Sequence, residues 1–241
     1  MKNYIKMKTI VLLLCLFFSF VTYAQEKELW DYPIKPGSPE WASFTNADQM
    51  WEACQIPDKI LETLSTKDLV KICLNFPFFF NYALLDDERT GPSFAIKNFN
   101  GLSELSKRRD GVFELINAYG EFPIFSQFPD RSSKDYFTPY KLPWIELLLA
   151  DETFIKQLNE QESGELGEII VEKYMRKVEN INVYSLWNIK KTFLLCAVNI
   201  LNYSMTEKTP QQQETIRCFI ENYMYADETL LTEMSKIISG L

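Results

Sequence analysis

Histidine is absent from the 241 residues of this chain, and its absence excludes several kinds of chemistry. Without an imidazole there can be no Ser-His-Asp or Cys-His catalysis, no zinc or haem held by histidine, and no imidazole pH switch. Glycine is scarce at 8 residues, and no G-x-G-x-x-G or G-x-x-x-x-G-K pattern provides a phosphate loop. No serine stands three residues before a lysine either. We therefore predict no catalytic residue, no cofactor and no metal site, and favour a non-catalytic protein.

Residues 1–24 have the pattern of a secretory signal peptide. Three lysines precede an apolar run over 9–21, and small residues lead to a cleavage site after Ala24. The run is shorter than the ~20 residues that a membrane-spanning helix needs. We predict export to the periplasm or the cell exterior, with no transmembrane segment in the mature chain. Cys15 follows three leucines rather than small residues, so a lipid anchor is not expected.

Acidic residues outnumber basic ones, at 33 Asp and Glu against 25 Lys and Arg. Cleavage after Ala24 removes three lysines and no acid, so the formal net charge falls from −8 to −11. Nucleic-acid phosphates require clusters of Lys and Arg, and the one basic cluster, at 107–109, is followed directly by Asp110. We therefore expect a protein, peptide or glycan partner outside the cytoplasm, and no nucleic acid.

Helical patterns fill most of the chain after residue 45. Ser65 and Thr209 each stand where a hydroxyl caps a helix start, and Asp227 stands before the last helix. Residues 185–203 are apolar on almost every side, which predicts a central helix. No segment alternates as a strand does, and no repeat of fixed period is present. The sequence thus predicts a single all-α domain over 46–241, built of packed helical hairpins in an irregular array.

Two proline-rich segments interrupt the helical pattern. Residues 25–45 contain Pro33, Pro36 and Pro39, and we predict an extended strap whose aromatic side chains lie on the domain. Residues 121–143 are predicted to form a long loop, which either covers the core or faces a ligand. Aromatic rings provide stacking surfaces for sugars and peptides. The candidate ligand surface therefore consists of Trp30, Tyr32, Trp41, Phe122, Phe125, Phe128, Tyr136, Phe137 and Tyr140.

Four cysteines follow the predicted cleavage site: Cys54, Cys73, Cys196 and Cys218. Export permits disulfides, but none of the four has CxxC spacing, and each lies in an apolar helical context. Such cysteines act as small buried hydrophobic residues. We predict buried thiols, and we predict that Cys54 and Cys73 would form the bridge if one exists.

Clusters of acidic residues suggest two further sites, which the sequence does not favour. Residues 86–91 resemble the start of a calcium loop, but Lys97 stands where a bidentate Glu is required, so a solvated turn is expected. Five glutamates over 160–172 could serve acid–base chemistry, since glycoside hydrolysis needs only paired carboxylates. Their helical spacing indicates an exposed helix face.

Parts of residues 32–105 resemble a group of uncharacterised exported bacterial proteins. The likeness lies in a Tyr-Pro-x-Lys-Pro-Gly opening over 32–37 and an Asn-Phe-Asn-Gly-Leu segment over 98–102. It extends to shorter matches between them, at 53–57, 64–66 and 73–80. The resemblance implies export and no particular activity.

Three functions are consistent with these features. The first is a non-catalytic helical protein that binds a protein, peptide or glycan through the strap and the aromatic loop. The second is a histidine-free hydrolase or lyase, which predicts two carboxylates about 5–9 Å apart in a deep cleft. The third is an acidic inhibitor or immunity-type protein, which predicts one continuous acidic face. The first is favoured because no residue pattern requires chemistry.

Overall fold

The computed structural model describes residues 29–133 and 135–241, so the predicted signal peptide lies outside the described residues. Asp31–Leu241 forms one compact unit, and Met1–Trp30 is assigned to another. The described residues form thirteen α-helices and four 3₁₀ helices and no strand, which confirms the all-α prediction. From Asp31 onward, the predicted strap belongs to the same compact unit as the helices.

The first half of the compact unit is made of short helices. They are α2 (Pro39–Ala42), α3 (Ala47–Ala53), α4 (Asp58–Leu61), α5 (Thr66–Leu74), η1 (Phe79–Leu84), η2 (Glu88–Thr90), α6 (Gly91–Asn98), α7 (Asn100–Leu105) and α8 (Gly111–Glu121).

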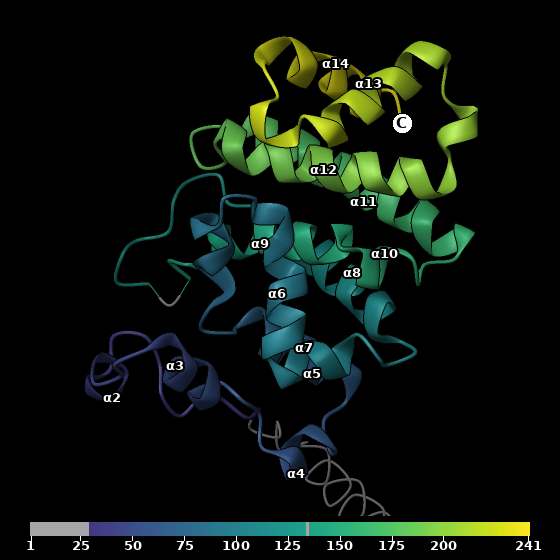
Figure 1. Ribbon diagram of the computed structural model, residues 1–241. Coiled ribbons are helices and arrows are strands. Elements are labelled where there is room, and N and C mark those ends of the chain that lie inside the picture. The colour runs from purple at the N-terminus through teal and green to yellow at the C-terminus, as the bar shows by residue number, and fades with distance from the viewer. Residues whose placement is uncertain (1–28, 134) are drawn as a thin grey trace, which may run out of the picture. The chain divides into compact units, whose positions relative to one another are not determined.

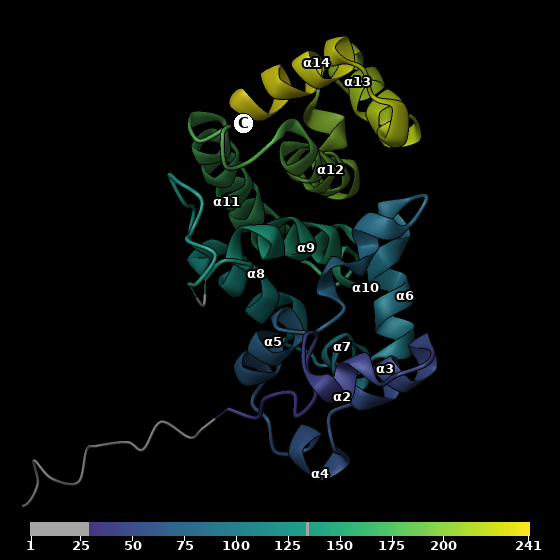
Figure 2. The ribbon, with the colours of Figure 1, turned by 90° about the vertical axis from the view of Figure 1, so that its left-hand side faces the viewer.

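The second half contains the longer helices. They are α9 (Thr138–Ala150), α10 (Glu152–Ile155), α11 (Glu160–Glu179), α12 (Leu186–Tyr203), η3 (Met205–Glu207), α13 (Pro210–Glu221), η4 (Tyr223–Tyr225) and α14 (Glu228–Ser239). Within this unit, α12 packs against α9, α11, α13 and α14 (Figures 1 and 2). The prediction that residues 185–203 form a central helix is therefore confirmed.

Local capping signals in the sequence produce the helix starts that were predicted. The Ser65 hydroxyl accepts a hydrogen bond from the Asp68 amide, and α5 follows. Thr209 and Gln212 form a reciprocal capping box at α13. The Asp227 carboxylate accepts from the Leu230 amide at α14. Each cap satisfies backbone amides that a helix leaves unpaired at its first turn.

Two predictions based on proline are wrong in part. The strap is not extended throughout, because Ser38 caps a short helix that begins at Pro39. Likewise the loop predicted over 121–143 ends earlier, since α9 begins at Thr138 and includes Pro143. Proline removes one backbone hydrogen bond inside a helix. Burial of the apolar residues that follow, through Leu149, outweighs that loss.

Gly91 allows α6 to start against η1. A Cβ at this position would lie 2.5 Å from the Tyr82 Cβ and 3.2 Å from its Cα. We expect Gly91→Ala to lower the free energy of unfolding by about 1–3 kcal/mol, because the backbone of η1 must shift. Gly164→Ala is the control: apart from the chain neighbours and the nearby backbone of α11 itself, no atom lies within 4 Å of its Cβ site, so this change should raise stability by about 0.5–1 kcal/mol. Urea unfolding of both variants measures the contrast, and equal effects would contradict it.

Candidate functional site: an aromatic surface and two buried ion pairs

Tyr32 is not available to a ligand, which corrects its place in the candidate surface. Its side chain is buried, and its hydroxyl donates to the Ile72 carbonyl at 3.0 Å. Its ring lies 6.5 Å from that of Phe76 and 6.3 Å from that of Phe99. A ring with a satisfied hydroxyl is stable inside an apolar core. Tyr32 therefore anchors the strap to the domain.

Trp41 is half-buried and belongs to a group of rings at the surface of the domain. It lies 5.3 Å from Phe78, and Phe78 stacks on Trp51 at 4.8 Å with the planes 17° apart. Phe94 meets Trp51 edge-on at 5.6 Å and is exposed. The other strap tryptophan, Trp30, is half-buried and falls in the unit Met1–Trp30.

The aromatic loop over 122–137 presents part of its rings to solvent. Phe128 lies 6.0 Å from Tyr136 and 5.4 Å from Tyr140, and Phe137 lies 5.1 Å from Tyr136. Phe137 is 60% exposed, and Phe128 is exposed as well. Tyr140 also meets the exposed ring of Phe80 edge-on at 5.5 Å.

The backbones of Phe122 and Phe125 hold the start of the loop. Both residues are half-buried. The Phe122 carbonyl accepts from the Lys173 ammonium at 2.9 Å, and the Phe125 amide donates to the Tyr184 hydroxyl at 2.9 Å. These bonds hold the loop against the domain and leave its later rings exposed.

The consecutive residues Phe78, Phe79 and Phe80 connect the strap to the loop. Phe78 contacts Trp41, and Phe80 contacts Tyr140. Sequence reasoning did not include these residues, although five residues from Phe76 to Phe80 contain four phenylalanines. Exposed apolar groups gathered in one region mark interaction sites more often than scattered ones do. We define the aromatic surface as Trp41, Phe78, Phe80, Phe94, Phe128, Tyr136, Phe137 and Tyr140.

One buried ion pair joins four helices. Glu146 of α9 pairs with Lys177 of α11 at 2.7 Å, and both side chains are fully buried. Glu146 also accepts from the hydroxyls of Tyr119 in α8 and Thr192 in α12, each at 2.9 Å. The charged atoms thus satisfy one another, as buried charges must. The pair is part of the core, and its carboxylate is not open to a substrate.

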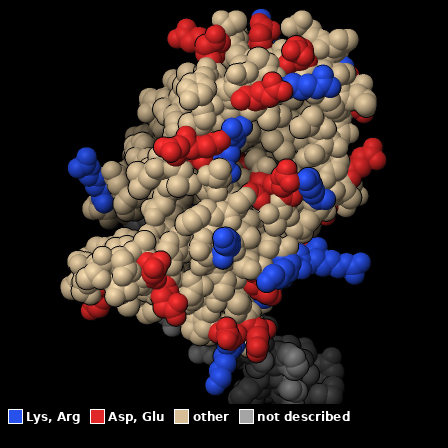
Figure 3. Space-filling model, viewed as in Figure 1, with Lys and Arg blue, Asp and Glu red and all other residues tan. Residues whose placement is uncertain are grey.

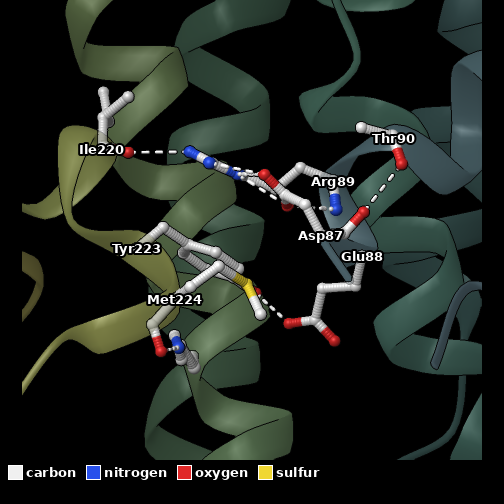
Figure 4. Close-up of polar contacts among 8 residues, drawn as sticks. Asp87, Glu88, Arg89, Thr90, Ile220, Tyr223 and Met224 are labelled. Carbon is white, nitrogen blue, oxygen red and sulfur yellow. Dashed lines mark hydrogen bonds and ion pairs between the residues drawn. The ribbon is translucent and has the colours of Figure 1, made fainter. Parts of the chain in front are cut away.

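A second buried ion pair links η2 to the C-terminal helices. Glu88 accepts from the Tyr223 hydroxyl at 2.5 Å (Figure 4). Its carboxylate also pairs with the Lys191 ammonium at 2.6 Å. Beside it, Arg89 pairs with Asp87 and donates to the Ile220 carbonyl at 2.7 Å. The prediction that residues 86–91 form a solvated turn is therefore wrong at Glu88, because Glu88 is buried.

Burial changes the pKa values of the groups in the second pair. It lowers the pKa of Lys191 from its usual 10.5 to about 7, although Glu88 opposes the shift. Burial and the Glu88 charge raise the pKa of the Tyr223 hydroxyl. The Lys191 ammonium also lies 3.2 Å from the centre of the Trp187 ring. A lysine of lowered pKa is a feature of some catalytic sites, but the Lys191 side chain is fully buried and has no path to a substrate.

The four cysteines are free thiols in the structure, so no bridge joins Cys54 to Cys73. Burial raises the pKa of Cys54 and of Cys196 to about 12, and it raises that of Cys73 as well. Thiols react as thiolates, so these three are inert at neutral pH. Cys218 is half-buried.

The acidic clusters noted in the sequence lie in a helix cap, in an ion pair or at the exposed face of a helix. In residues 29–133 and 135–241, no group of three or more Cys, Asp or Glu side chains is arranged to hold a metal ion. Of the glutamates over 160–172, Glu162 completes a capping box with Asn159, and Glu172 pairs with Arg176 at 3.3 Å. Glu160, Glu165 and Glu168 are exposed, as the helical spacing predicts.

The fold and these groups together define an all-α protein with two closed internal ion pairs and an exposed aromatic surface. No family model matches the chain, and the searches of curated proteins and of solved structures gave no match. Among the described residues, no helix is both long enough and apolar enough to cross a membrane.

Proposed function

We propose that this protein is an exported, non-catalytic binding protein whose aromatic surface contacts a protein, a peptide or a glycan. The observation that carries the proposal is the presence of two groups of rings that the segment 78–80 connects along the chain. One group joins Trp41, Phe78, Trp51 and the exposed Phe94. The other joins Phe80, Tyr140, Phe128, Tyr136 and Phe137, and its three phenylalanines are exposed. Tyr and Trp in such clusters combine an apolar face with a polar group. Exposed rings of this kind commonly supply most of the energy of a binding interface.

The buried carboxylates support a binding role over a hydrolase. Such an enzyme needs an acid and a base that reach the substrate from two sides of a cleft. Here Glu88 and Glu146 are each buried and each bound to a lysine. Neither is available to transfer a proton to a bound substrate.

The charges on the face drawn in Figure 3 favour the binding role over an acidic inhibitor. On the face drawn in Figure 3, acidic and basic side chains are interspersed, and uncharged surface lies between them. An inhibitor of a basic partner would present charge of one sign to raise its association rate. The aromatic surface depends on apolar contact instead.

Loss of two exposed rings should weaken binding. Panning a random peptide library and a glycan array against the wild-type protein supplies ligands, and Phe80→Ala with Phe137→Ala should reduce the affinity of those ligands at least about tenfold. The reason is that the ligand loses the apolar area of both rings, whereas the buried core of the protein is unchanged. Isothermal titration calorimetry measures the affinities.

Tyr225→Ala is the matched control, because Tyr225 is 89% exposed and lies outside the aromatic surface. It should leave the affinities unchanged. The proposal is contradicted if neither library gives a ligand, or if the selected ligands bind the double variant and the wild-type protein equally well.

A further inference from the structure

A groove of about 390 Å³ lies among α11, α12 and α14, near the C-terminal end of the chain. It shares no residue with the aromatic surface. The ten residues that line it include Val178, Ile181, Leu186, Ile189, Phe193 and Glu228. The volume falls in the range of known ligand sites.

The groove is apolar along its base and along one rim. Ile189 and Phe193 of α12 are buried at the base, whereas Val178, Ile181 and Leu186 are exposed. The hydroxyl groups that line the groove already have hydrogen-bond partners within the protein. The hydroxyls of Tyr174 and Ser235 share one hydrogen bond, and the Thr232 hydroxyl donates to the Glu228 carbonyl. An occupant would therefore gain mainly by removing apolar surface from water.

Charge in the groove has one sign. Glu228 is the only charged residue among the ten that line it, and it is exposed. Asp227 precedes it and Glu179 follows Val178, and both of these acids are exposed. Lys236, which follows Ser235, is also exposed, but its charge is paired with Glu233 at 2.6 Å. The whole chain also has a net charge of −8. A cationic occupant is complementary to this rim, and an anionic one is repelled.

The backbone of the domain indicates the conformation of the occupant. An extended peptide is commonly held by adding a strand to an exposed sheet edge, and the described residues contain no strand. A helix satisfies its own backbone hydrogen bonds and offers a row of apolar side chains at positions i, i+3, i+4 and i+7. A groove between three helices fits such a row.

We propose that this groove binds one amphipathic helix of a partner protein, with the apolar face of that helix against Val178, Ile181 and Leu186 and a Lys or Arg beside Glu228. The groove is thus a second interaction site, which stands whether or not the aromatic surface binds a ligand.

The test uses a fluorescein-labelled synthetic helix with leucine on one face and lysine on the other. Fluorescence anisotropy should detect binding to the wild-type protein, and Ile181→Asp should weaken it at least about tenfold, because a charge enters the apolar contact. Ile181 is 53% exposed, so the fold should tolerate the change. Leu201→Asp is the control: it is 44% exposed on α12, outside the groove, and should leave the affinity unchanged. Glu228→Gln should weaken binding a few-fold and reduce its dependence on salt.

Several outcomes would overturn the proposal. One is equal binding of a peptide with the same composition and a scrambled order. Another is equal weakening by Ile181→Asp and Leu201→Asp. A dimer of the wild-type protein that Ile181→Asp dissociates in sedimentation velocity would show instead that a second copy covers the groove.

Discussion

Lys177→Met is expected to lower the free energy of unfolding by about 3–5 kcal/mol. The change removes the ammonium but leaves Glu146 fully buried, with only the hydroxyls of Tyr119 and Thr192 as donors. A buried carboxylate without its cation has lost water and gained no equivalent partner. Urea unfolding at pH 7, followed by circular dichroism, measures the loss.

Two controls separate the buried charge from a general effect of the substitution. Glu146→Leu combined with Lys177→Met removes both charges and should recover most of the loss, because well-packed apolar residues often replace a buried pair without penalty. Lys156→Met breaks the exposed pair with Glu152 and should change stability by less than about 0.5 kcal/mol. If Lys177→Met has an effect as small as Lys156→Met, the buried pair does not stabilise the fold as argued.

Raising the pH from 7 to 9 should strengthen the contribution of Lys191 to stability. Its pKa is about 7 in the folded protein and 10.5 in the unfolded chain, so between these values the unfolded chain binds the proton and the folded protein does not. Stability then rises with pH, by at most about 1.4 kcal/mol per unit. Below pH 7 both states bind the proton, and this dependence disappears.

The reference for this measurement is the double variant Glu88→Gln with Lys191→Met, which removes both members of the pair. Other groups titrate in both proteins: for example, thiols such as Cys54 ionise near pH 8.5–9 only when the chain unfolds, which lowers both stabilities. The free energy of unfolding of the wild-type protein, minus that of the double variant, should therefore increase by about 2–3 kcal/mol from pH 7 to pH 9. If this difference in the free energy of unfolding stays constant from pH 7 to pH 9, the lowered pKa of Lys191 is contradicted.

The parts of the fold that the sequence predicted are those set by short-range physics. Capping by Ser65 and Thr209 depends on residues three positions away, and both caps are present. The position of α12 follows from an apolar run that no exposed helix would carry. In contrast, the start of α9 was predicted wrongly, because the burial of its leucines and not its proline content decides the conformation there.

The site was less predictable because its parts are far apart in the chain. The aromatic positions in the strap and loop were identified from composition, but burial of Tyr32 depends on Phe76 and Phe99, which local patterns do not place beside it. The segment Phe78–Phe80, which joins the two groups of rings, was not recognised. Neither ion pair has the i, i+4 spacing that a helix pattern shows, since Glu146 and Lys177 are 31 positions apart.

The bond between Glu88 and Tyr223 spans 135 positions, and this separation has a consequence for the order in which the chain folds. A contact between residues so far apart in the chain closes a long loop. The chain entropy that this closure loses must be offset by contacts that have already formed. While the chain is being synthesised, Glu88 emerges long before its partners on α12 and η4. Until those segments exist, its carboxylate has neither Lys191 nor Tyr223 to bind, and η2 is held only by its neighbours η1 and α6. A chain that ends before η4 therefore lacks the hydroxyl that this carboxylate binds.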